Sequence, residues 1–130
     1  MDSPDPKRPW EHHYSAQRVV VVVEAQNMRV LDAILAVGEL VPWHYHSNID
    51  DHFWVIEGKL RIESQSPDKM QELSAGDYCS IPAGCPHQVV NAGGGNCRFI
   101  NLQGVGSYDY IPAGGSSHTR LTEGGGNGET

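Results

Sequence analysis

The sequence lacks the features that define disulfide-rich and membrane-spanning proteins. Its three cysteines, Cys79, Cys85 and Cys97, are an odd number without a Cys-x-x-Cys pair, which argues against a disulfide framework and a thiolate zinc site. The longest aliphatic run, 19–23, is far below the ~18 residues that span a bilayer. The first ten residues contain three prolines and no apolar run of the kind a secretory signal needs. We therefore expect reduced thiols, no membrane partner and a cytoplasmic location.

Positive charge is also scarce. Nine Lys and Arg residues stand against 16 Asp and Glu, giving a net charge of −7, and the basic residues form no cluster. Nucleic-acid binding depends on neutralising phosphates with a basic face, so we expect no nucleic-acid partner. A small-molecule partner fits the composition better.

The 130 residues, 38% of them hydrophobic, suit one domain. Residues 1–17 are rich in proline and polar side chains and are expected to form an N-terminal arm, and residues 113–130 are expected to form a glycine-rich, flexible tail. The domain itself is predicted to span residues 18–112. His12, His13 and His118 lie in the two end segments and are expected to be solvated.

Short runs rich in β-branched residues alternate with Gly, Pro, Asn and Asp throughout the domain. This pattern predicts an all-β fold, a sandwich or a closed barrel. Residues 30–41 could form a helix, but their β-branched content and the strands around them favour sheet. The predicted strands lie near residues 18–23, 28–37, 41–46, 53–57, 59–64, 70–73, 78–81, 86–90 and 97–103.

Two groups of residues at fixed spacing are the strongest signal in the sequence. The first contains Gly38, His44, His46, Asp51 and Gly58, and the second contains Gly76, Pro82, Gly84, His87 and Asn91. The order and spacing of these residues resemble the two motifs that define the cupins, and the one mismatch is Asp51, where the family has glutamate. The resemblance implies a double-stranded β-helix, or jelly-roll barrel, of the small single-domain type.

The resemblance also implies a metal site formed by His44, His46, Asp51 and His87. Side chains two apart on a strand share a face, so the first two imidazoles can converge on one point. These ligands suit one divalent transition metal, Fe, Mn, Ni, Cu or Zn, without selecting among them. Four ligands leave coordination places open, as a catalytic site requires.

Asp51 is shorter than glutamate by one methylene group, and this leaves several roles open for it. It could ligate the metal directly, or it could accept a hydrogen bond from a metal-bound water and act as the catalytic proton acceptor. Asp50 is a second candidate ligand, although the spacing to Gly58 favours Asp51. His52 has the opposite strand parity and is expected not to be a ligand. A degenerate site without metal is a further alternative.

Strand parity also predicts which side chains line the barrel. An apolar lining suits a hydrophobic or aromatic substrate, although it could equally be barrel filling. The inward set is expected to comprise Phe53, Val55, Leu60, Ile62 and Val89. Arg61, Arg98 and Gln103 are polar candidates if they point inward. The same parity places Trp43, Tyr45 and Trp54 on the outer face, which favours a homodimer, unless another part of the chain covers these rings.

Cupin folds support several functions, so the fold alone does not choose among them. An open metal position beside a carboxylate favours an enzyme, first a mononuclear-metal dioxygenase acting on a small bidentate enol, keto or aromatic substrate. A non-redox isomerase or cyclase is the first alternative. A non-catalytic binding or sensing protein is the second.

Overall fold

The computed structural model describes residues 15–65 and 68–113, and these residues form ten strands and no helix. Accordingly, no helix of the described residues is long and apolar enough to cross a membrane. Nearly all of the expected arm and tail lies outside the described residues, including His12, His13 and His118. The strands are β1 (Arg18–Ala25), β2 (Met28–Leu35), β3 (Leu40–Tyr45), β4 (Asp50–Glu57), β5 (Lys59–Ser64), β6 (Lys69–Ser74), β7 (Tyr78–Ile81), β8 (His87–Asn91), β9 (Cys97–Gly104) and β10 (Ile111–Pro112).

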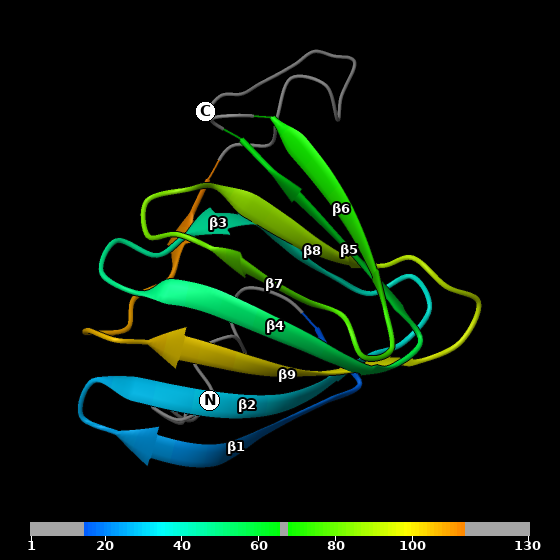
Figure 1. The fold of residues 1–130 in the computed structure, drawn as a ribbon, viewed down its shortest axis with the longest axis horizontal. Coiled ribbons are helices and arrows are strands. Elements are labelled where there is room, and N and C mark those ends of the chain that lie inside the picture. The colour runs from blue at the N-terminus through cyan, green and yellow to red at the C-terminus, as the bar shows by residue number, and fades with distance from the viewer. Residues whose placement is uncertain (1–14, 66–67, 114–130) are drawn as a thin grey trace, which may run out of the picture.

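The strands form two antiparallel five-stranded sheets. The first has the order β1-β2-β9-β4-β7 and the second the order β10-β3-β8-β5-β6. In Figure 1 the strands of the first sheet lie one above the other from β1 at the bottom to β7. Consecutive strands often lie in different sheets, as in a jelly roll, so the two motifs approach each other from distant parts of the sequence.

The core lies between the two sheets. Leu60, Ile62 and Cys97 have no exposed surface, and Phe53 and Val55 are 2% exposed. Inward and outward residues alternate along β5 and β9, as expected for strands with one face on the core. All five residues of the expected inward set are buried.

The predicted strands agree with the structure except at some ends. The ambiguous stretch after residue 30 is strand as far as Leu35 and then turns at Gly38. β4 begins at Asp50, so Asp51 lies within this strand and shares the inward parity of Phe53. β10 was not predicted, because its two residues are too short for a pattern of alternation.

Trp43 is buried, as the alternative of cover by another part of the chain allows. It is 6% exposed and neighbours the equally buried His44, and it is not one of the residues of the hydrophobic core cluster. The register between β3 and β8 shifts between Val41 and His44. Such an irregularity breaks the alternation of faces on which the prediction depended. Trp54, by contrast, is 38% exposed, as expected.

Candidate metal centre

The four predicted ligands come together from three strands. His44 lies near the end of β3 and His46 just beyond it, Asp51 lies on β4 and His87 begins β8. One potential ligand atom from each of these four side chains lies within 4.8 Å of the others, and all four residues are buried. Contacts of 2.9 to 3.1 Å join Oδ2 of Asp51 to Nε2 of His87 and His46. The structure therefore brings together the four residues that the sequence motifs single out.

The backbone fixes the orientation of all three imidazoles. Nδ1 of His44 lies 2.7 Å from the carbonyl oxygen of Pro42, Nδ1 of His46 lies 2.5 Å from that of Asp109, and Nδ1 of His87 lies 2.9 Å from that of Cys85. A carbonyl oxygen only accepts, so each Nδ1 carries the proton. In a neutral ring Nε2 then presents its lone pair to the cluster, which is the arrangement found around metal-bound histidine. In a charged ring Nε2 also carries a proton, which it can donate to Oδ2 of Asp51.

Both oxygens of Asp51 have defined partners. Oδ1 accepts a hydrogen bond of 2.7 Å from Nδ2 of Asn101 and a longer one of 3.4 Å from Nε2 of Gln103. Oδ2 faces the two histidines. The shorter side chain thus still reaches the cluster, and one oxygen is positioned for a cation while the other is held by amides.

Burial and the close packing of like groups set the protonation of the cluster. Burial lowers the pKa of His44 well below 6.5, and the neighbouring His87 and His46 lower it further. Burial raises the pKa of Asp51, but hydrogen bonds from His46 and His87 outweigh it, so this pKa lies well below 3.8. Burial also lowers the pKa of His46, yet the hydrogen bond and charge of Asp51 raise it above 6.5 overall.

These directions favour an ion pair in which His46 carries the proton and Asp51 is an ionised carboxylate. A divalent cation can take the place of that proton, because metal binding to histidine and carboxylate displaces protons. Three imidazole nitrogens and one carboxylate oxygen are ligands that first-row transition ions accept. The residues present therefore fit the metal that the motif implies.

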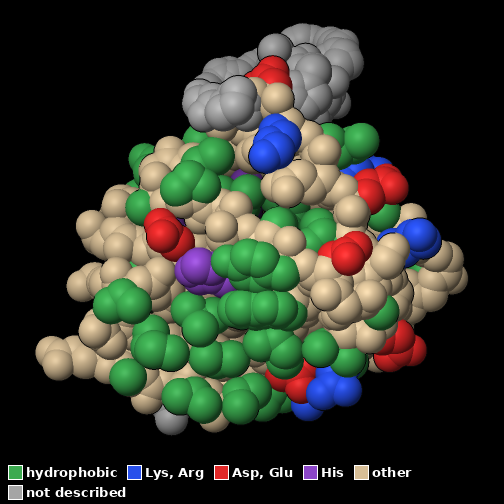
Figure 2. Space-filling view, in the orientation of Figure 1, with side chains coloured by type: hydrophobic (Ala, Val, Ile, Leu, Met, Phe, Trp, Pro, Cys, Tyr) green, Lys and Arg blue, Asp and Glu red, His purple; other side chains and the backbone are tan. Residues whose placement is uncertain are grey.

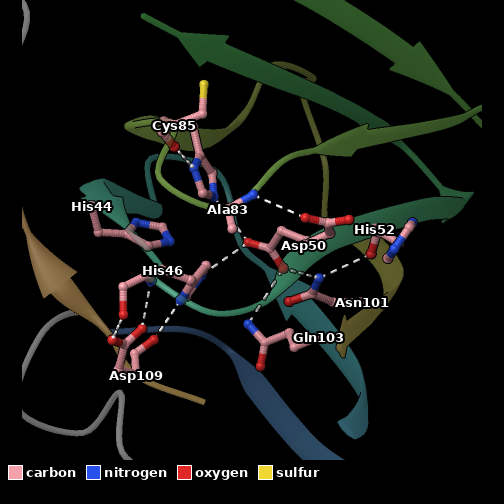
Figure 3. A network of polar contacts seen from close by, with 12 residues as sticks. His44, His46, Asp50, His52, Ala83, Cys85, Asn101, Gln103 and Asp109 are labelled. Carbon is pink, nitrogen blue, oxygen red and sulfur yellow. Dashed lines mark hydrogen bonds and ion pairs between the residues drawn. The ribbon is translucent and has the colours of Figure 1, made fainter. Parts of the chain in front are cut away.

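Asp50 and His52, the neighbours of Asp51, point elsewhere (Figure 3). Oδ1 of Asp50 accepts a hydrogen bond of 2.9 Å from the backbone N–H of Ala83. Asp50 thus supports the turn that precedes His87 and does not join the cluster. Nδ1 of His52 lies 2.7 Å from the hydroxyl of Tyr78 on the outer face. The backbone N–H of Gly84 also donates to the carbonyl of His46 at 2.7 Å, which joins the second motif to the first.

The segment after β9 contributes residues that sequence reasoning missed. Tyr110 stacks on His44, with ring centroids 4.4 Å apart, and Tyr108 lies 5.4 Å from His46 in the same measure. Between them, the carboxylate of Asp109 accepts hydrogen bonds from the backbone and hydroxyl of Ser47. The sequence signal that could have identified these residues is the polar and aromatic run Ser-Tyr-Asp-Tyr after a core strand. Nothing in the spacing of this run indicates which end of the barrel it covers.

A pocket opens beside the cluster and contains about 430 Å³ of space that no atom fills, part of it open to solvent. Phe53 and Val89 line it, whereas Val55, Leu60 and Ile62 fill the core. The expected inward set thus divides between pocket wall and barrel filling. Gln103 points inward as considered, while Arg98 pairs with Asp32 and Arg61 pairs with Glu63.

The fold and the cluster define a double-stranded β-helix protein with a three-histidine, one-aspartate site. A family model described as the cupin domain matches residues 31–102. The match covers more than half of the chain, and the chain belongs to this family. No curated protein matches the chain with significance.

Solved structures support the same fold. An uncharacterized conserved protein with a double-stranded β-helix domain from Klebsiella pneumoniae subsp. pneumoniae MGH 78578 is 21% identical, with a TM-score of 0.64 over 78% of this chain and 90% of that one. A tryptophan-to-tyrosine variant of the oxalate decarboxylase of Bacillus subtilis is 18% identical, with a TM-score of 0.67 over 77% of this chain and 29% of that one. Another Bacillus subtilis oxalate decarboxylase structure, from a study of its Mn(II) centers, is 21% identical, with a TM-score of 0.61 over 67% of this chain and 24% of that one.

The chain therefore spans less than a third of the length of these decarboxylases. At such identities the likeness concerns the fold alone.

Proposed function

We propose that the chain is a metal-dependent enzyme that carries out dioxygenation of a small substrate offering two oxygen atoms. The observation that carries the proposal is the set of four buried donor atoms within 4.8 Å of one another, with each imidazole oriented by a backbone carbonyl. The proposed ligands of one divalent ion are His44, His46, Asp51 and His87. The Mn(II) centers of the similar decarboxylase make manganese one candidate beside Fe, Ni, Cu and Zn.

When bound, a redox-active ion supplies the chemistry by which both atoms of O₂ enter the substrate. The protein's own contribution is to place and shield the substrate. Phe53, Val89 and Phe99 form apolar walls of the pocket, which exclude water and strengthen polar contacts inside. Because the pKa of Asp51 lies well below 3.8, ligation suits this carboxylate better than proton abstraction.

Two tyrosines favour non-redox isomerisation or cyclisation as a second candidate. Burial raises the pKa of Tyr108 to about 12 and raises that of Tyr110 further. Both hydroxyls stay protonated at neutral pH, and both residues line the pocket beside the histidines. Such groups can donate a proton or hydrogen bond to an enolate oxygen.

Oxygen uptake tests the proposal and separates the two candidates. Protein loaded in turn with Fe(II), Mn(II), Ni(II), Cu(II) or Zn(II) would be mixed with catechol, acetylacetone and phenylpyruvate in an oxygen electrode. The proposal predicts substrate-dependent O₂ consumption that is absent in the His44→Ala/His87→Ala double variant. Turnover that continues at the same rate under nitrogen would replace dioxygenation by the non-redox reaction. Stoichiometric metal and no turnover on any compound in either atmosphere would favour a binding or sensing role.

We propose in addition that two copies pair through the outer face of the first sheet. The strand registers place Val20, Ile100, Trp54 and Tyr78 in or next to one row across β1, β9, β4 and β7. Figure 2 shows apolar side chains gathered over this sheet. Four strands of eight residues and one of four, ~4.8 Å apart, give a face of roughly 600 Å². A stable dimer buries about 800 Å² per partner, so a second copy is an occupant of matching size.

A further inference from the structure

Arg29 is a buried cation without an ion-pair partner among the described residues. It lies on β2 with its side chain turned inward and is 4% exposed. No carboxylate of residues 15–65 and 68–113 forms an ion pair with it, whereas Arg18, Arg61 and Arg98, all more exposed, each pair with an acidic side chain. A buried charge without a counter-charge costs folding free energy, so a ligand is the natural source of the missing negative charge.

The guanidinium group is held in one orientation. Its Nε donates a hydrogen bond of 2.9 Å to Oε1 of Gln103, and its Cζ lies 3.6 Å from the ring centroid of Tyr108. Tyr108 in turn contacts His46, and Gln103 donates to Asp51. Arg29 is thus one residue removed from two of the proposed metal ligands. The two Nη groups carry most of the N–H donors of the guanidinium group. A hydrogen bond to the hydroxyl of Tyr108 uses only part of them, so N–H donors remain for a ligand.

Arg29 lines the same pocket as His44, His46 and Asp51. The rest of the wall is largely apolar and includes Leu31 and Phe99. A single guanidinium in an apolar pocket matches the charge and the two acceptor oxygens of one carboxylate, whereas a phosphate dianion needs more donors. Part of the 430 Å³ is open solvent, so the enclosed part of the pocket is smaller than this and fits only a small molecule.

We propose that Arg29 binds the carboxylate of the substrate, so that the substrate class is a small carboxylic acid with a second oxygen function that reaches the metal ligands. This inference rests on the proposed function only for the contact between the second oxygen function and the metal site. The carboxylate contact itself requires Arg29, Gln103 and Tyr108 and no metal ion.

Paired acids and amides of equal size test the proposal. Titration calorimetry would compare pyruvate with pyruvamide and benzoate with benzamide, on metal-loaded and EDTA-treated wild type, Arg29→Gln and the matched control Arg61→Gln. We expect wild type and the control to bind the acids more tightly than the amides. We also expect Arg29→Gln to lose about tenfold or more of the acid affinity, as loss of a charge-assisted pair does, with unchanged metal content. Equal affinity for acid and amide in wild type, including no binding of either, would overturn the proposal.

Thermal unfolding supplies a second readout for Arg29. If the residue only supported packing, Arg29→Gln would lower Tm and leave the acid-to-amide ratio unchanged, which would overturn the proposal. A binding role predicts that Tm stays level or rises, because an uncompensated buried charge is removed.

If Arg29→Gln does not fold, wild-type protein alone can test the proposal. In that case the acids, and not the amides, should protect Arg29 from phenylglyoxal in peptide mass spectrometry, and failure to protect would overturn the proposal. The two proposals can fail separately. If the protein binds no metal but still prefers acids to amides, the metal-enzyme proposal fails and the role of Arg29 stands.

Discussion

Asn101 donates a hydrogen bond of 2.7 Å from its side-chain amide to Oδ1 of Asp51. The same amide nitrogen lies 2.9 Å from the carbonyl oxygen of His52, so β9 holds the carboxylate of β4 from the side opposite the histidines. This contact orients the carboxylate so that Oδ2 faces His46 and His87.

Replacing Asn101 should therefore weaken metal binding without removing a ligand. We predict that Asn101→Ala lowers metal affinity roughly 10- to 100-fold, the range usual for partners that orient a ligand. Competition against a chromogenic chelator measures this affinity. Gln88→Ala, on the outward side of β8, is the matched control and should bind like wild type. An unchanged affinity in Asn101→Ala would show that the amide does not position Asp51.

Two motif glycines allow backbone strain and steric conflict to be tested separately. Gly38 and Gly58 have φ of +87° and +86°, a region in which side chains other than that of glycine are strained. A Cβ on Gly38 meets nothing within 4 Å, but one on Gly58 would lie 2.5 Å from the carbonyl oxygen of Asn96. We predict that Gly38→Ala lowers the free energy of unfolding by about 1 kcal/mol and that Gly58→Ala lowers it by more than about 2 kcal/mol. Urea unfolding measures both, and equal losses would contradict the steric account.

The ion pair between Asp32 and Arg98 on the outer face predicts a pH-dependent stability. Two hydrogen bonds of 2.7 and 3.0 Å from Arg98 hold the pKa of Asp32 below its ordinary 3.8. A lowered folded-state pKa stabilises the fold above about pH 3.8, and the contribution fades as pH falls through the folded value. Asp32→Asn should thus unfold more easily than wild type at pH 7, with the gap closing below pH 3.8.

Thermal melts of the two proteins between pH 2.5 and 7 provide the measurement. Glu63→Gln, which removes the more local pair with Arg61, is the control. A gap between Asp32→Asn and wild type that stayed constant with pH would rule out this linkage.

The outer sheet face predicts a concentration-dependent dimer. Trp54 and Tyr78 are 38% and 48% exposed, with ring centroids 4.8 Å apart. A glutamate in place of Trp54 would bury a charge in the proposed interface, so Trp54→Glu should be monomeric at concentrations where wild type is dimeric. Light scattering after size exclusion reports the mass. Met70→Glu, at an exposed position on the other sheet, should leave the dimer intact, and a monomeric wild type would refute the pairing.

The members of the four-residue cluster could be predicted from the sequence because motif spacing is a local property. His44 and His46 share a face by strand parity, and Asp51 proved to lie on the continuous strand that its parity required. The supporting residues could not be predicted, because their contacts join distant positions. Asn101 lies 50 residues from Asp51, and the contact between Arg29 and Gln103 spans 74 residues.

Parity arguments are also weak where the register is irregular. Trp43 and His44 are neighbours and both are buried, and the register of β3 against β8 shifts between Val41 and His44. Similar shifts interrupt the pairings of β1 with β2 and of β4 with β9, and the sequence pattern indicates none of them. The same limit hid Tyr108 and Tyr110, since no strand period connects their segment to the site.

The metal content of the purified protein tests the central claim most directly. Untagged protein prepared without added metal would be analysed by plasma mass spectrometry beside the His44→Ala/His87→Ala variant. Our account predicts close to one transition-metal ion per chain in wild type and none above background in the variant. Equal metal in both proteins, or none in wild type even after reconstitution with each candidate ion, would contradict it.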